Sequence, residues 1–257
     1  MFKFDNNEKK IFLEKGFVID KTICKLSSFE LLSKKFKIEL KEYLMKNNIS
    51  NLGGFNAGNL NINPGIYGKE IFKIIRDHNF DEYFKFLTDE EIGDFEVSFG
   101  GNLNLPKSKK QFYHTDGNWS PRMIILNIAT SQINSLNGPL ELVESSHKKK
   151  ETYLSFLINS FFKKKTKILL NEGEILIREH NLWHRGTTNY TNHFREMIGI
   201  MFIKKNDKKK MNYKEDNGIV IFSNMFGITL REKIKEFIFV YLKFVFFFYK
   251  IFLSIKN

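Results

Sequence analysis

The sequence predicts a mainly β protein, a sandwich or jelly-roll barrel, with helices before and after the strands. Short β-type runs begin near residue 95, and turn signals such as Asn137-Gly138-Pro139 separate them. No internal repeat is present, so the runs belong to one barrel rather than to a repeat array. The predicted strands cover residues 95–105, 123–128, 140–143, 167–170, 174–178 and 195–203.

The region before the strands is predicted to be largely helical. In residues 28–46, apolar side chains recur at spacings of three and four, which is typical of an amphipathic helix. Ser27 or Ser28 is a candidate N-terminal cap of that helix. The other elements expected here are helices over 7–15 and 69–87, a short strand over 16–19 and an Asn- and Gly-rich loop over 50–68.

Length and charge are those of one folded domain with extensions and a basic surface. The chain has 257 residues and a net charge of +12, with lysine triplets at 148–150, 163–165 and 208–210. We favour a solvated lysine surface over a patch for phospholipid or nucleic acid, because no nucleic-acid-binding signature accompanies the charge. Cys24 is the only cysteine and the N-terminal residues lack a secretory signal, which predicts a cytoplasmic protein.

The tail after residue 205 has a different character. Residues 206–217 are polar and predict a loop, whereas 229–255 predict an almost entirely apolar helix. Glu236, Lys243 and Lys250 lie seven residues apart and would form one narrow polar stripe. Charges inside the stretch disfavour a simple membrane span, so a helix in the membrane interface and a helix packed on the barrel or in a dimer seam stay open.

A metal site is predicted from three side chains. His114 and Asp116 are two residues apart near a strand, so their side chains share one face. His184 is the best third ligand, with His180 as its rival. Two imidazoles and a carboxylate on one face are typical of non-haem Fe(II) oxygenases, and leave positions for a 2-oxo acid and O2. Arg195, eleven residues after His184, offers the planar fork that the distal carboxylate of 2-oxoglutarate requires.

These motifs together resemble the phytanoyl-CoA dioxygenase family of Fe(II)/2-oxoglutarate oxygenases. Residues 111–117 (QFYHTDG) resemble its first metal motif, and 137–148 (NGPLELVESSHK) its central segment. Residues 173–186 resemble the strand and turn that carry the second histidine, and Arg195 falls at the spacing of the 2-oxoglutarate arginine. The resemblance spans about residues 8–203, but Glu144-Ser145 stands where the family usually has Pro-Gly.

The resemblance implies a double-stranded β-helix (a cupin-like jelly roll) with N-terminal helices and a C-terminal apolar helix. The oxygenase domain would cover 1–205, with its barrel core at about 95–205, and 206–257 would form an extension without a family counterpart. The implied cofactors are Fe(II), 2-oxoglutarate and O2, and the implied reaction hydroxylates an unactivated C–H bond with release of succinate and CO2. Similar halogenases carry Gly or Ala in place of Asp116, which favours hydroxylation here. We expect a small or lipid-linked substrate.

Several further residues have two interpretations. Asn104 could bind the other carboxylate of 2-oxoglutarate or be an ordinary strand-end asparagine. Trp119 and Trp183 could line the substrate pocket or belong to the core, and His147 is expected to hold a turn. Two rival functions also remain, a non-oxidative metal-dependent cupin enzyme and a barrel that binds a ligand without catalysis. Arg195 at its spacing counts against both.

Overall fold

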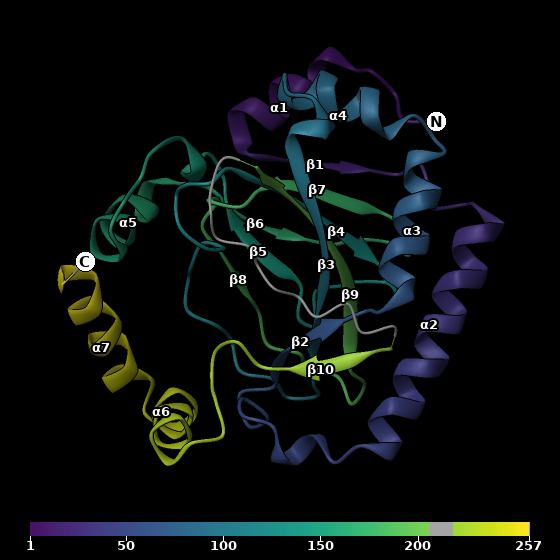
Figure 1. Ribbon diagram of the computed structural model, residues 1–257. Helices are drawn as coiled ribbons and strands as arrows, with labels where there is room; N and C mark the ends of the chain where they lie inside the picture. Colours follow the sequence, from purple (N-terminus) through teal and green to yellow (C-terminus); the bar gives the residue numbers. More distant parts are fainter. Residues whose placement is uncertain (206–217, 257) are drawn as a thin grey trace.

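Two antiparallel sheets form the body of the protein, as a computed structural model shows for residues 1–205 and 218–256 (Figure 1). The large sheet has the strand order β1-β7-β4-β9-β3-β2-β10, and the small sheet has the order β6-β5-β8. The predicted loop over 206–217 and the lysine triplet at 208–210 lie outside the described residues. The strands are β1 Phe17–Asp20, β2 Asn59–Asn63, β3 Phe95–Asn104, β4 Met123–Ala129, β5 Leu140–Val143, β6 Lys165–Ile168, β7 Ile175–Glu179, β8 His184–Gly186, β9 Arg195–Lys204 and β10 Val220–Phe222.

The large sheet is buried on both faces, but its two faces differ in chemistry. In β4, Leu126 and Ile128 pack into the main hydrophobic core beneath the helices. Asn127 points to the opposite face, towards the small sheet, and accepts a hydrogen bond from Arg178 of β7. The space between the sheets therefore receives polar side chains among apolar ones such as Leu142 of β5.

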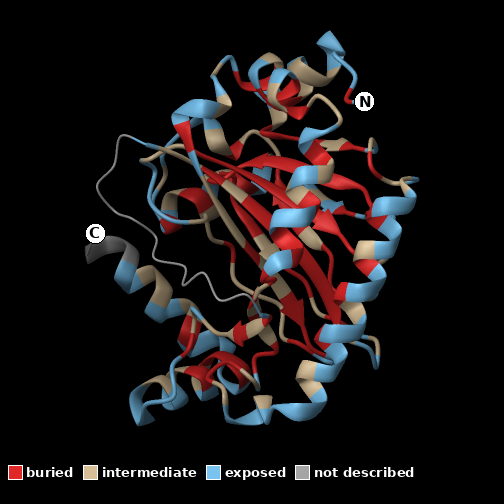
Figure 2. Ribbon diagram, turned by 45° about the vertical axis from the view of Figure 1, so that its right-hand side comes forward, coloured by how far each residue is buried: buried red, intermediate tan, exposed pale blue. Residues whose placement is uncertain are grey.

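Helices α1 to α4 cover the outer face of the large sheet (Figures 1 and 2). Phe36 of α2 and Ile71 of α3 are fully buried in the core that they share with the sheet. Helix α5 and the C-terminal pair α6 and α7 lie on the other side of the molecule (Figure 1). The helices are α1 Asn6–Lys15, α2 Ser27–Lys46, α3 Ile66–Arg76, α4 Phe80–Thr88, α5 Tyr153–Asn159, α6 Leu230–Tyr241 and α7 Lys243–Lys256.

The structure corrects three expectations about the first ninety residues. The predicted helix over 69–87 is two helices, because Asn79 has a φ of 69° in the left-handed region. The predicted loop over 50–68 contains strand β2, in which Leu60 and Ile62 alternate with polar residues and are buried. Neither predicted cap is used, since α2 begins at Ser27 after Leu26 without a side-chain cap.

The apolar tail is two helices rather than the single helix predicted over 229–255. Leu242, with φ −120° and ψ 52°, separates α6 from α7. Phe239 and Phe246 from the two helices are buried against Phe112, whose ring stacks on that of Phe246 at a centroid distance of 5.4 Å. The tail thus packs on the body of the protein. None of the described helices is both long and apolar enough to cross a bilayer.

The spacing of the charged residues had predicted that Glu236 belongs to a polar stripe on the helix. The structure instead buries the side chain of Glu236 against the body of the protein. Its carboxylate accepts hydrogen bonds from the backbone N–H groups of Gly54 and Ala57, at 3.0 and 2.9 Å. Both N–H groups belong to the loop that leads into β2. The side chain of Glu236 therefore ties α6 to the body of the protein.

We expect Glu236→Ala to lower the free energy of unfolding by about 2 kcal/mol or more, because it leaves two buried N–H groups without acceptors. Urea denaturation and faster amide exchange at residues 54 and 57 would measure this loss. Glu232→Ala on the same helix is the matched control, since Glu232 pairs only with the partly exposed Lys235 at 3.3 Å. Equal losses in both variants would contradict the assigned role of Glu236.

Lys250 is the second residue of the predicted stripe that the fold draws inward. Its Nζ donates to the backbone carbonyl of Tyr113 at 3.0 Å and lies 4.4 Å from the ring centre of Tyr153. Burial in this aromatic surrounding lowers the pKa of Lys250 from 10.5 to about 8. The folded state therefore disfavours the charged ammonium.

A pH series tests this burial. Between about pH 8 and 10.5 the unfolded chain binds more protons at this position than the folded chain, so the folded state gains stability as pH rises. We expect wild type to gain stability relative to Lys250→Met between pH 7 and pH 10, by on the order of 1–3 kcal/mol. Because both proteins carry the same other titrating groups, a stability difference independent of pH would contradict the prediction.

Candidate metal centre

His114 and His184, seventy positions apart in the chain, are joined by their backbones. The N–H of each donates to the carbonyl of the other at 2.9 Å, forming an isolated antiparallel bridge between the segment before β4 and strand β8. The two imidazole rings then lie 4.5 Å apart between their centroids. A further backbone bond, from Asp116 N–H to the carbonyl of His180 at 3.0 Å, holds the carboxylate of Asp116 beside them.

Each histidine ring is oriented by its own backbone. Nδ1 of His114 lies 2.9 Å from the carbonyl oxygen of Phe112, and Nδ1 of His184 lies 2.9 Å from that of Leu182. A carbonyl only accepts hydrogen bonds, so Nδ1 carries the proton in both rings. The lone pair of each Nε2 is therefore free, as a metal ligand requires.

Asp116 completes a group that could hold a metal ion. One ligand atom from each of His114, Asp116 and His184 lies within 4.8 Å of the others, and Oδ2 of Asp116 is 3.5 Å from Nε2 of His184. The same oxygen accepts a hydrogen bond from Nη2 of Arg178 at 2.5 Å. Arg178 is itself buried and held through Nε by Asn127 at 2.9 Å.

The protonation states of the group suit a cation. Burial lowers the pKa of His184 to about 3 and also lowers the pKa of His114, so both imidazoles are neutral at pH 7. Burial alone would raise the pKa of the Asp116 carboxyl, but His184, Arg178 and His114 together hold it well below its usual value. Two neutral imidazoles beside an ionised carboxylate form a donor set for a divalent metal.

Arg195 lies at the start of β9, directly opposite Asn104 of β3 in the sheet register. Its guanidinium is buried, and burial lowers the pKa of Arg195 to about 10. Nη2 donates to the carbonyl of Gly138 at 2.7 Å, while Nε and Nη1 have no hydrogen-bond partner among the described residues. Gly138 also neighbours the segment that follows His184, because a Cβ there would lie 3.2 Å from the carbonyl of Thr187. The turn at Gly138 thus connects Arg195 to the end of β8.

The other histidines near the motifs have different surroundings. His180, the rival ligand, is buried, and both of its ring nitrogens face backbone groups. Nδ1 lies 3.0 Å from the backbone nitrogen of Met123, and Nε2 lies 2.9 Å from the carbonyl oxygen of Asn118. His147 packs its ring against Gly16, where an added Cβ would lie 2.4 Å from Nδ1. It therefore holds the turn after β5 against the loop between α1 and β1.

The two tryptophans lie in unlike places. Trp183 precedes His184 in an extended segment, so its side chain points to the opposite face. There it is buried and stacks on Phe156 at 4.0 Å and 9°, which is the packing of a core residue. Trp119 follows the first metal motif and is 37% exposed. Of the two side chains considered for the substrate pocket, only that of Trp119 is accessible.

The sequence interpretation missed Arg178 and Asn127. The signal for Arg178 was available, because with Glu179 it is one of two charged residues that end the otherwise apolar strand Ile175–Glu179. A charge in a strand buried on both faces needs a partner, and here the partner is Asp116. Nothing in its own local sequence distinguishes Asn127 from an ordinary strand residue.

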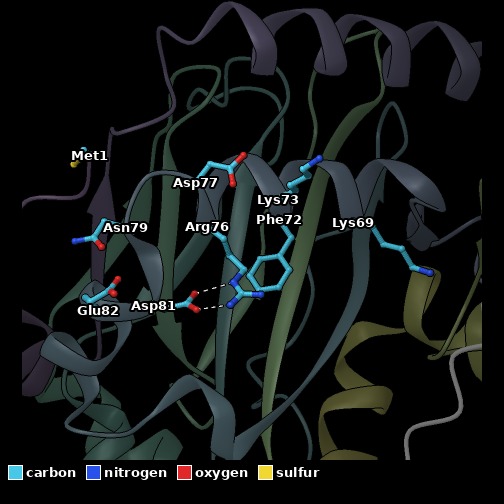
Figure 3. Close-up of a pocket in the computed structure, with 9 residues that line it drawn as sticks. All are labelled: Met1, Lys69, Phe72, Lys73, Arg76, Asp77, Asn79, Asp81 and Glu82. Atoms are coloured by element: carbon cyan, nitrogen blue, oxygen red, sulfur yellow. Dashed lines mark hydrogen bonds and ion pairs between the residues drawn. The ribbon is translucent and has the colours of Figure 1, made fainter.

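A surface hollow on α3 and α4 lies apart from this centre (Figure 3). Arg76 and Asp81 form a bidentate ion pair in it, with Nε and Oδ1 2.9 Å apart. The remaining lining residues are mostly exposed charged groups, and the hollow contains no histidine. We assign it no part in the metal centre.

Two antiparallel sheets with two histidines and an aspartate converging between them define the class of cupin-like jelly-roll proteins with a metal-binding site. Residues 76–197 match the family described as phytanoyl-CoA dioxygenase (PhyH). For this part of the chain, the match confirms the family that the motifs had predicted. The limits of the predicted domains, 1–205 and 206–257, remain a prediction.

Solved structures share the fold at low sequence identity. AviO1 from Streptomyces viridochromogenes Tue57 has a TM-score of 0.63 at 13% identity, covering 81% of this chain and 99% of its own. The non-heme alpha ketoglutarate dependent carbocyclase SnoK from nogalamycin biosynthesis has 0.59 at 14%, covering 78% and 84%. EctD from S. alaskensis, solved with 2-oxoglutarate and 5-hydroxyectoine, has 0.59 at 16%, covering 77% and 76%. A search of curated proteins gave no match.

We expect Arg178→Met to weaken binding of a divalent metal by roughly tenfold to a hundredfold, because Asp116 loses the hydrogen bond that orients its carboxylate. Competition titration with Co(II), with folding checked by circular dichroism, would measure the change. Arg76→Met is the matched control, since Arg76 pairs with an aspartate away from the centre. Tighter metal binding in Arg178→Met would instead mean that Arg178 competes with the metal for Asp116.

Proposed function

We propose that this protein is an Fe(II)- and 2-oxoglutarate-dependent dioxygenase that hydroxylates an unactivated C–H bond, with release of succinate and CO2. One observation carries the proposal: a His-Asp-His group and a buried arginine with two unpartnered nitrogens project from the same barrel. The match of residues 76–197 to the phytanoyl-CoA dioxygenase family and the fold shared with 2-oxoglutarate-dependent enzymes support it.

The donor set fits Fe(II). His114 and His184 would bind through Nε2, and Asp116 through a carboxylate oxygen, so three protein ligands would leave the remaining positions of the metal open. A closed structural zinc site would supply four protein ligands, and none of the described His, Cys, Asp or Glu side chains joins the three. The open positions are those that a chelating 2-oxo acid and O2 require.

Arg195 fits the distal carboxylate of 2-oxoglutarate. A buried guanidinium with two unsatisfied nitrogens is costly unless an anion accepts from them, and a carboxylate can accept from both. No carboxylate of the described residues hydrogen-bonds to Arg195. Asn104, opposite Arg195 in the sheet, has its amide nitrogen only weakly engaged, 3.4 Å from the carbonyl of Gly138. We propose it as a second contact for the oxo acid.

When bound, iron supplies the activation of O2 that oxidises both the oxo acid and the substrate. The chain's own residues orient and insulate this chemistry. Arg178 holds the carboxylate of Asp116 in place, and the backbone carbonyls of Phe112 and Leu182 fix the two imidazoles. His184, Arg178 and Arg195 are buried, so the protein side of the centre is shielded from water.

Two other functions would use the same barrel. A non-oxidative metal-dependent cupin enzyme would need the metal ligands but not Arg195. A non-catalytic binding protein would need neither an intact set of metal ligands nor Arg195. The two guanidinium nitrogens of Arg195 without a partner among the described residues favour the oxygenase over both. The primary substrate is proposed only as a class, a small or lipid-linked molecule, because the related structures bind different small molecules.

Anaerobic titration of Fe(II)-loaded protein with 2-oxoglutarate tests the proposal directly. We expect a weak visible charge-transfer band from the chelate, and Arg195→Met should raise the apparent Kd for 2-oxoglutarate by on the order of tenfold to a hundredfold. Asp116→Ala should abolish the band through loss of iron. Succinate formation on admission of O2 provides the second measurement.

Arg231→Met is the control for Arg195→Met, since Arg231 is exposed at the start of α6. It should leave the titration unchanged. Folded wild type that binds iron but gives no band would overturn the oxygenase proposal in favour of the cupin enzyme. Folded wild type that binds no iron would overturn it in favour of the binding protein.

A further inference from the structure

The outer surfaces of α5 and α7 carry large apolar side chains that nothing in the described structure covers. Phe161 and Phe162, in the short 3-10 helix Ser160–Phe162 that continues α5, are 80% and 92% exposed. Soluble proteins expose single apolar residues commonly but rarely expose contiguous aromatic ones. We call this surface the aromatic face; its members are Ile158, Phe161, Phe162, Phe244, Val245 and Phe248.

The two helices are neighbours, and both present exposed apolar side chains beside their packed sides. Leu157 of α5 packs in the same cluster as Phe247 and Ile251 of α7. Figure 1 shows both helices on the side of the molecule opposite α2. The inner sides of the helices are already occupied, since Phe156 of α5 is fully buried against Trp183. A rotation that buried the aromatic face would expose this inner cluster, so the face needs an external partner.

The charges around the aromatic face are almost all positive. Residues 148–165 contain six lysines, in the triplets 148–150 and 163–165, and a single acidic residue, Glu151. The side chain of Glu151 is 2% exposed and pairs with Lys163 at 3.6 Å. Residues 237–257 contain no acidic residue. Lys148, Lys149 and Lys150 are exposed immediately before α5, and Lys164 and Lys165 immediately after its continuation.

Exposed aromatic side chains flanked by lysines favour an anionic membrane over a second copy of the chain as the partner. A symmetric dimer through the aromatic face would bring the same lysine triplets of two copies close together, and the like charges would repel. A bilayer that contains anionic phospholipid would accept the aromatic side chains at the headgroup boundary and attract the lysines. None of the described helices could span such a bilayer, so contact would be peripheral.

We propose that the aromatic face docks peripherally on a membrane that contains anionic phospholipid. The proposal goes beyond the oxygenase function and does not depend on it. Docking would place α7 between the bilayer and Tyr113, the residue before His114 of the candidate metal centre. The lysine triplets, which the sequence alone left as a solvated surface, gain a role from their position on both sides of one aromatic patch.

Co-sedimentation of the full chain with vesicles tests the docking. We expect binding to vesicles of mixed phosphatidylglycerol and phosphatidylcholine, weak binding to phosphatidylcholine alone, and weaker binding at high salt. Phe161→Ser with Phe162→Ser should lower the partition coefficient by about tenfold or more. Lys149→Glu with Lys150→Glu should lower it to a similar extent on anionic vesicles only.

Matched controls lie on α2, on the far side of the molecule (Figure 1). Leu31→Ser with Ile38→Ser removes exposed apolar residues, and Lys34→Glu with Lys35→Glu makes the same charge change. Both should leave the partition coefficient unchanged. Failure of wild type to bind anionic vesicles, or equal losses in the α2 controls, would overturn the proposal. So would a stable dimer in light scattering that Phe161→Ser with Phe162→Ser dissociates, since the aromatic face would then be a subunit interface.

Discussion

The reciprocal backbone hydrogen bonds between His114 and His184 are the constraint on which the candidate site depends. They join two segments that the chain separates by the whole of β4 to β7. Neither segment forms a long strand around this point: the bridge is isolated, and β8 has only three residues. The surrounding sheets must therefore hold the two segments in register. Because the bridge sets the spacing of the two rings, any change in sheet packing would alter the site directly.

Buried charge is the second feature of this barrel. Arg178 and Arg195 both lie between the sheets, where an unpaired charge is strongly unfavourable. The charge of Arg178 is compensated within the chain by Asp116, and Asn127 accepts from its Nε, while its Nη1 has no partner among the described residues. Arg195 is compensated only in part, by the carbonyl of Gly138. On this contrast rests our proposal that Arg178 orients Asp116 within the protein, whereas Arg195 receives an anion from outside it.

The C-terminal helices extend the fold beyond the matched family region. They cover Phe112 and Tyr113 on the outside of the barrel while His114, the next residue, faces the metal centre. The same helices are apolar on their outer side, which a helix that served only to cover the barrel would not require. Three consecutive residues, Phe112, Tyr113 and His114, therefore lie between the C-terminal helices and the metal centre.

Period and spacing in the sequence predicted most of the strands and singled out the three side chains of the candidate metal centre and Arg195, because these depend on local alternation and on residue types that few chemistries use. The seven predicted strands, that over 16–19 included, lie within a few residues of observed strands, whereas β2 was hidden in an Asn-rich segment. Tertiary structure alone decided that Glu236 and Lys250 turn inward, that Arg178 pairs with Asp116, and that Trp183 faces away from His184. Each of these depends on a partner distant in the chain, and no local pattern of residues encodes which partner the fold will supply.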